Sequence, residues 1–157
     1  MSAVTVPVAK ARAAIFNKMT PATQKLATEV LANRTATQAT SVLACHRVGG
    51  LVARLLGDEA KYGAKAIDQV AAYVYADQHD TKQSVQRLYN LRNFHTSFEY
   101  EFVETWSYKT MANGGSLLYS HWLELMKIQE RSEQVKLLES VLRESKTATD
   151  LEAEIRA

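Results

Sequence analysis

The chain has 157 residues and a formal charge of +2, with 46% hydrophobic and 23% charged residues, which are ordinary values for a soluble globular protein. Its single cysteine excludes an internal disulfide, and no apolar run approaches the length of a membrane-spanning helix. The first residues also lack the charged and then apolar layout of a signal peptide, so we expect a cytoplasmic protein with no membrane partner.

Helix-forming residues dominate the chain. Only six glycines and two prolines are present, and both prolines lie within the first 21 residues. Long stretches of Ala, Leu, Glu, Lys, Gln and Arg favour helix. We therefore predict an all-α fold, a compact multi-helix domain with a helix-turn-helix-like core. The length suits one such domain, and two small lobes would also fit.

Charge is unevenly distributed along the chain. Residues 1–57 hold seven basic residues and one acidic residue, a net of +6, whereas residues 58–123 and 124–157 each net −2. A basic N-terminal third points to a polyanionic partner, although basic residues also decorate solvated helix faces. We divide the chain into a basic arm with a long helix or helix pair (1–57), a helix-turn-helix-like region (58–112) and a C-terminal helical layer (113–157), expected to form one unit.

The N-terminal region begins with residues 1–7, which we expect to form a loose arm, followed by a short helix over 9–19. Thr20 and Pro21 predict a helix start, because threonine is a favoured N-cap and proline is tolerated at the first helical position. The small, polar segment 33–40 is either the exposed middle of one long helix or a break between two.

Apolar residues at helical spacing resume over residues 42–56, which predicts a core-facing helix. Gly49 and Gly50 lie inside it and weaken it by about 1 kcal/mol each relative to alanine. Either the close approach of another helix or a local break would explain this pair. Cys45 lies among apolar residues and is expected to be a small core residue rather than a nucleophile.

A helix ending near residue 76, a polar turn at 78–80 and a second helix over 81–95 follow one another. This is the layout of a helix-turn-helix, although many all-α proteins contain two helices joined in this way. The second helix has no acidic residue from 81 to 95, and its cationic residues are Lys82, Arg87 and Arg92. Its apolar residues recur every three positions, at Val85, Leu88, Leu91 and Phe94. It is either a DNA recognition helix or an amphipathic helix with a solvated polar face.

The C-terminal region opens with an aromatic-rich helix over 98–111, whose rings we expect to pack in the core. The glycine-containing segment 113–116 is an interdomain joint or a loop. Helices are then predicted over 117–128 and 130–144. Thr149, with Glu152 three residues later, has the form of a capping box for a last helix.

Catalytic and metal-binding patterns were not found. The four histidines show no metal-ligand spacing, and one cysteine cannot build a zinc site. Ser120 and His121 are adjacent, so on a helix they point about 100° apart and do not form a nucleophile–base pair. His121 is expected to cap or satisfy a turn. We therefore predict no enzymatic activity and no cofactor.

Four blocks of residues occur in an order that resembles a known family. They are Tyr62-Gly63-x-x-Ala66-Ile67-x-x-Val70-Ala71, Ser84-Val85-x-x-Leu88-Tyr89-x-Leu91-Arg92-x-Phe94, Leu117-x-Tyr119-Ser120-His121-Trp122-x-x-Leu125 and Leu151-Glu152-x-x-Ile155. The blocks resemble the N-terminal helical domain of the YhcG-type bacterial proteins, over residues 42–157. The segment from Leu117 onward is also similar in layout to the helical DNA-binding region of ParB-type partition proteins.

These resemblances imply a bacterial or phage protein whose helical domain binds DNA or mediates assembly. YhcG-type proteins commonly carry a PD-(D/E)XK nuclease domain, which these residues lack, so no cleavage activity is implied. The chain is then a domain of a longer nuclease-containing protein, a stand-alone phage or plasmid protein, or a relative without the nuclease half.

The sequence therefore predicts a non-enzymatic DNA-binding protein of the helix-turn-helix type, which contacts duplex DNA through the helix at 82–95 and the basic N-terminal region. The predicted DNA-binding residues are Lys82, Gln83, Ser84, Gln86, Arg87, Asn90, Asn93, Arg47 and Arg54. Lys10, Arg12, Lys18 and Arg34 would add further contacts to the DNA backbone if they lie on the same side. The alternative is a protein–protein assembly module, a homo-oligomer or the recognition subunit of a nuclease complex, with the aromatic helices as its interface.

Overall fold

The computed structural model describes residues 2–34, 41–78 and 81–157. Within these ranges the chain is helical, and its only β pairing is an isolated bridge between Thr110 and Ser116. The all-α prediction is confirmed. The helices are α1 (Ser2–Phe16), α2 (Pro21–Ala32), α4 (Val42–Gly57), α5 (Glu59–Tyr62), α6 (Ala66–Val74), α7 (Thr81–Ser97), α8 (Tyr100–Ser107), α9 (Tyr119–Leu125), α10 (Arg131–Glu144) and α11 (Ala148–Arg156).

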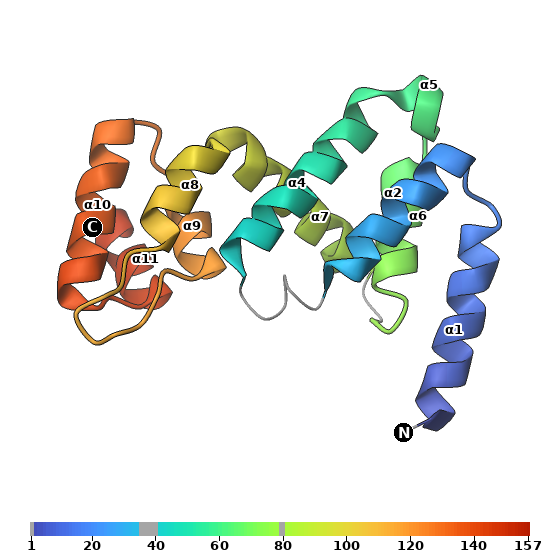
Figure 1. Ribbon diagram of the computed structural model, residues 1–157, viewed down its shortest axis with the longest axis horizontal. Helices are drawn as coiled ribbons and strands as arrows, with labels where there is room; N and C mark the ends of the chain where they lie inside the picture. The colour runs from blue at the N-terminus through green and yellow to red at the C-terminus, as the bar shows by residue number, and fades with distance from the viewer. Residues whose placement is uncertain (1, 35–40, 79–80) are drawn as a thin grey trace.

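The helices form an elongated molecule with α4 and α7 at its centre (Figure 1). Helices α1, α2, α5 and α6 gather at one end, and α8 to α11 gather at the other. Buried side chains from Met19 to Leu151 nevertheless belong to one hydrophobic cluster. None of the helices in the described ranges is both long enough and apolar enough to cross a bilayer.

Helix α1 corrects the expectation of a loose N-terminal arm, because residues 2–7 are helical and Pro7 lies inside the helix. The helix packs against α6, and Pro7 removes one backbone hydrogen bond from it. The predicted start of α2 is confirmed: Thr20 caps it by accepting a hydrogen bond from the Thr23 amide at 3.2 Å. Helix α2 ends at Ala32, and the part of the predicted segment 33–40 from residue 35 lies outside the described residues.

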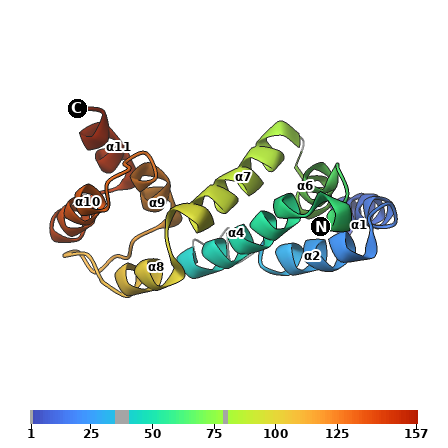
Figure 2. The same cartoon turned by 90° about the horizontal axis from the view of Figure 1, so that it is seen from above.

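Helices α4 and α7 lie side by side in opposite directions (Figure 2). A Cβ atom built on Gly49 would lie 2.1 Å from the Leu91 carbonyl oxygen, and one on Gly50 would lie 3.0 Å from the His95 ring. The first distance is too short for any side chain, and the second is tighter than most Cβ contacts, so the glycine pair permits the close approach of α7. Helix α4 runs unbroken through the pair, so of the two explanations the close approach is confirmed.

Aromatic rings join the central pair to the C-terminal helices. Trp122 of α9 lies 5.0 Å from Phe98 and 5.8 Å from Phe94 between ring centroids, and all three side chains are buried. Phe102 of α8 stacks on Phe98 at 5.9 Å. The expectation that the rings of segment 98–111 pack in the core is confirmed for Phe98. Phe102 and Trp106 are half-buried against the core, whereas Tyr100 and Tyr108 are exposed, so the expectation is wrong for those two. Cys45 is also buried, and burial raises the pKa of its thiol to about 12, as expected for a core residue.

The segment 113–116 is a loop bound to the end of α10. The Ala112 amide donates to the Leu142 carbonyl at 2.8 Å, and the Asn113 amide donates to the Ser145 hydroxyl at 2.9 Å. Ser145 ends α10 in the left-handed conformation, with φ 54°.

The capping box of the last helix lies two residues earlier than predicted. Thr147 and Asp150 form it, with reciprocal hydrogen bonds of 3.1 and 3.0 Å, in place of Thr149 and Glu152. Both pairs have the required spacing, and the end of α10 at Glu144 decides between them, because the chain is free to start a new helix by residue 148.

Candidate nucleic-acid interface

Helix α7 is held by α4 along its length and by α6 near its start. Its apolar stripe faces inward, as predicted: Leu88, Leu91 and Phe94 are buried and Val85 is half-buried. A turn over residues 75–77 follows α6, and residues 79 and 80 of the predicted turn lie outside the described residues.

The predicted polar residues of α7 divide between two sides of the helix. Lys82, Gln83, Gln86, Arg87 and Asn93 are exposed. Asn90 is half-buried.

Ser84 is buried, with 3% of its surface exposed, and it corrects the predicted set. It precedes Leu88 by four residues and Leu91 by seven, so it shares their inward face.

The two arginines of α7 lie over aromatic rings rather than beside carboxylates. The Arg87 guanidinium carbon lies 5.5 Å from the Tyr75 ring centroid, and that of Arg92 lies 5.4 Å from the Tyr89 centroid. Helix α7 contains no acidic residue, and among the described residues neither arginine forms an ion pair within 4.0 Å. Their charge therefore stays on the surface.

The amide side chains on α7 are ordered by neighbours on the same helix. Gln86 Nε2 donates to Asn90 Oδ1 at 3.0 Å, and Arg92 Nε donates to Asn93 Oδ1 at 2.8 Å. Both donors and acceptors remain available on this face, because each amide has further hydrogen-bonding capacity.

Two of the N-terminal basic residues are engaged inside the fold. Arg12 donates to the carbonyls of Tyr73 and Val74 at 2.8 and 2.9 Å. Arg34 donates to the Val74 carbonyl at 3.1 Å and pairs with both carboxylate oxygens of Asp77 at 2.7 and 2.9 Å. The carbonyls at a helix C-terminus lack intrahelical partners and carry partial negative charge, so both arginines cap α6. This accounts for part of the basic N-terminal third without a polyanion.

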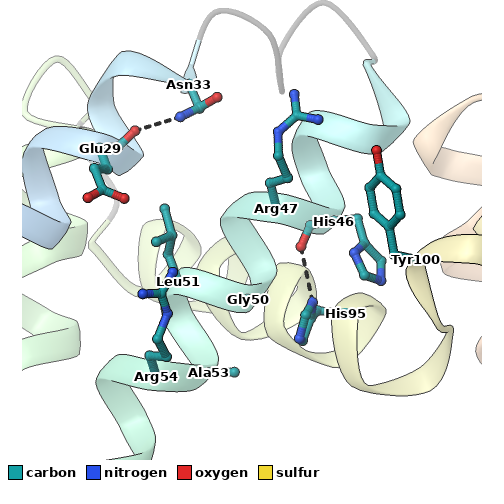
Figure 3. Close-up of a pocket in the computed structure, with 10 residues that line it drawn as sticks. All are labelled: Glu29, Asn33, His46, Arg47, Gly50, Leu51, Ala53, Arg54, His95 and Tyr100. Atoms are coloured by element: carbon teal, nitrogen blue, oxygen red, sulfur yellow. Dashed lines mark hydrogen bonds between the residues drawn. The ribbon is translucent and has the colours of Figure 1, made fainter. Parts of the chain in front are cut away.

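Arg47 and Arg54 lie on α4 and line a cleft of about 680 Å³ beside α2 (Figure 3). Both are exposed. At about 100° per residue, they are about 160° and about 140° around α4 from Gly49, the residue that faces α7. On α7, Gln86 and Asn93 are likewise about 140° and about 160° from Leu91, which faces α4. Gln86 and Asn93 on α7 and the two arginines on α4 therefore point to opposite sides of the helix pair. Arg87 precedes Leu91 by four residues, so it lies only about 40° from the side of α7 that faces α4.

Sequence reasoning missed the aromatic wall of this cleft, which consists of His46, His95 and Tyr100. The His46 and His95 rings lie 4.6 Å apart between centroids, although 49 residues separate them in the sequence. His46 Nε2 lies 2.6 Å from the Phe98 carbonyl and His95 Nδ1 lies 3.2 Å from the His46 carbonyl, so these nitrogens carry the donated protons. Burial lowers the pKa of His46. No sequence spacing signals this pair, because the packing of α4 on α7 creates it.

Other chemistry is limited in the described part of the chain. His121 accepts a hydrogen bond from the Leu118 amide at 3.0 Å and donates one to the Lys146 carbonyl at 2.8 Å, which confirms that it satisfies a turn. Among the described residues, no group of three or more His, Cys, Asp or Glu is placed to hold a metal ion.

Comparisons with protein-family models, curated proteins and solved structures found no match to the chain.

Proposed function

We propose that the chain is a non-enzymatic helical protein that binds duplex DNA through the exposed face of α7. One observation carries the proposal: this face combines cationic and amide side chains with no acidic residue along the whole helix. A helix of 17 residues is about 25 Å long, and the major groove is wide enough to admit an α-helix.

The side chains on this face match the two kinds of contact that DNA recognition needs. Lys82 and Arg87 supply charge for phosphates, which give affinity and register. Gln86, Asn90 and Asn93 supply amides, which can pair with adenine N6 and N7 in the major groove. Arg87 also has the bidentate geometry for guanine O6 and N7, and the Tyr75 ring beneath it supports the guanidinium.

The decisive experiment is binding to a random-sequence duplex pool over a salt series, followed by sequencing of the retained DNA. Affinity that falls with salt, together with an enriched motif, would support recognition by α7, since phosphate contacts make binding salt-dependent. A palindromic motif would indicate a dimer. An absence of binding at low salt would overturn the proposal.

The alternative function is protein–protein assembly. Of the aromatic residues that suggested it, Phe98 and Trp122 are buried, and Phe102, Trp106 and Tyr119 are half-buried against the core. Tyr108 is 74% exposed, and Tyr100 and Leu118 are 39% and 40% exposed, so a smaller apolar surface remains. Oligomers seen by light scattering, together with no salt-dependent DNA affinity, would favour this function.

A further inference from the structure

The cleft beside α2 is a shallow trough whose floor is the outer face of α4 (Figure 3). Glu29 and Asn33 of α2 form one wall, and His95 and Tyr100 form the other. Its volume of about 680 Å³ falls within the range of small-molecule sites, which is about 300 to 1,000 Å³.

The floor of the trough is apolar at its centre. Gly50, Leu51 and Ala53 lie there, between the two arginines. Gly50 has no side chain, and the His95 ring occupies the space beside it, where a Cβ would lie only 3.0 Å from the ring. The result is a flat surface with an imidazole along one side.

Charge in the trough comes from Arg47 and Arg54, which are seven residues apart and so about 10 Å apart along the axis of α4. Neither arginine forms an ion pair within 4.0 Å among the described residues. Figure 3 shows the Arg47 side chain directed away from the Glu29 carboxylate. The Arg47 end is therefore the more favourable place for an anion.

We propose that this trough binds a nucleotide, a ligand that joins a flat aromatic base to a phosphate. Arg47 binds the phosphate by charge-assisted hydrogen bonds. The base lies on the floor at Gly50, between Leu51 and the His95 ring. Arg54 adds positive charge, and the Glu29 carboxylate accepts a hydrogen bond from a ribose hydroxyl or an exocyclic amino group.

This site is distinct from the DNA-binding face proposed for α7, because its arginines lie on α4 and none of the proposed α7 contacts lines it. The same chemistry fits a free nucleoside monophosphate and a nucleotide within a single strand. AMP and a short oligothymidine are therefore both used as probes. The probe that binds shows whether the ligand is a free nucleotide or part of a single strand.

The experiment is calorimetric titration of the full chain with AMP, adenosine, inorganic phosphate and the oligothymidine. We expect either AMP or the oligothymidine to bind. If AMP is the probe that binds, its affinity should exceed that of adenosine and that of phosphate. Arg47→Ala should lower the affinity for the probe that binds about tenfold or more, since the substitution removes a hydrogen bond to a charged group. It should leave the weak affinity for adenosine unchanged, which a merely structural defect would not do.

Arg143→Ala is the charge-matched control, because Arg143 is exposed on α10. Unchanged far-ultraviolet circular dichroism establishes that the variants are folded. No saturable binding of AMP up to about 10 mM and none of the oligothymidine, or equal binding by Arg47→Ala and the wild type, would overturn the proposal. Titration of Arg47→Ala and Arg87→Ala with both AMP and duplex DNA separates a failure of this site from a failure of the α7 face.

Discussion

Gly49 and Leu91 set the distance between the two central helices, because a Cβ on Gly49 would lie 2.1 Å from the Leu91 carbonyl oxygen. The obstructing atom belongs to the backbone, so it cannot be relieved by a side-chain rotation. Any residue larger than glycine at this position must push α7 away from α4.

Gly49→Ala is therefore expected to lower the free energy of unfolding by about 1 to 3 kcal/mol, the usual cost of overpacking a core. The helix propensity of alanine, which is more favourable than that of glycine by about 1 kcal/mol, only partly offsets this cost. Urea denaturation followed by circular dichroism measures the difference.

Gly57→Ala is the matched control for this variant. Gly57 is also in α4, but a Cβ there would meet nothing within 4 Å. Its stability should be unchanged or slightly raised. Equal destabilisation by both substitutions would show that the contact with Leu91 is not the cause.

His121 links the start of α9 to the segment before α11. Its ring accepts from the Leu118 amide and donates to the Lys146 carbonyl, and the residue is only 2% exposed. His121→Phe keeps a ring but removes both hydrogen bonds, so it should lower the free energy of unfolding by about 1 to 3 kcal/mol for each group left unpaired.

Ser120→Ala, one residue away and exposed, is the control and should be close to neutral. Thermal melting of the two variants against the wild type measures both effects. A wild-type melting temperature for His121→Phe would mean that these hydrogen bonds add nothing to stability.

Asp77 pairs with Arg34 at the end of α6, and the hydrogen bonds from the Arg34 guanidinium lower the pKa of its carboxyl below the ordinary 3.8. A lowered pKa in the folded state means that the ionised carboxylate favours folding. Its contribution is therefore present above pH 3.8 and is lost as the pH falls through the folded-state pKa.

Asp77→Asn should therefore be less stable than the wild type at neutral pH, by less than about 1 kcal/mol because the pair is partly exposed. The difference should disappear in acid. Urea denaturation at a series of pH values measures it, and Glu139→Gln, an exposed substitution on α10, is the control. A difference that persists below the folded-state pKa would contradict this account.

The helices with strong apolar periodicity could be predicted closely, as α4 and α10 show. Two other features could not. Thr147 and Thr149 both begin a capping pattern, and only the position where α10 ends separates them. Local patterns are also silent on which neighbouring helix covers the inward face of α7, on which the spacing from Leu88 and Leu91 places Ser84.

The candidate site was less predictable than the fold for the same reason. The N-terminal basic residues do not lie on one surface, because Arg12 and Arg34 cap α6, and Arg47 lies on the side of α4 opposite α7. Such assignments depend on the rotation of each helix about its axis, which tertiary packing determines.

Arg87 offers the sharpest test of DNA binding by α7. Arg87→Ala is expected to weaken affinity by about 1 to 3 kcal/mol, because the variant loses a contact to a guanine edge or a phosphate. A base contact would relax the enriched motif at one position, whereas a phosphate contact would weaken all sequences alike and reduce the salt slope. Fluorescence anisotropy with the enriched duplex over a salt series distinguishes these two outcomes.

The fold should not change in Arg87→Ala, because the side chain is exposed and lies on the outer face of the Tyr75 ring. Arg156→Ala removes an equal charge from α11, at the far end of the molecule, and controls for net charge. A larger effect of Arg87→Ala than of Arg156→Ala, at equal melting temperatures, places the contact on α7. Equal affinities in both variants would remove α7 from the DNA interface, since the charge would then act only through the long-range field, which salt screens within about 10 Å at 0.1 M.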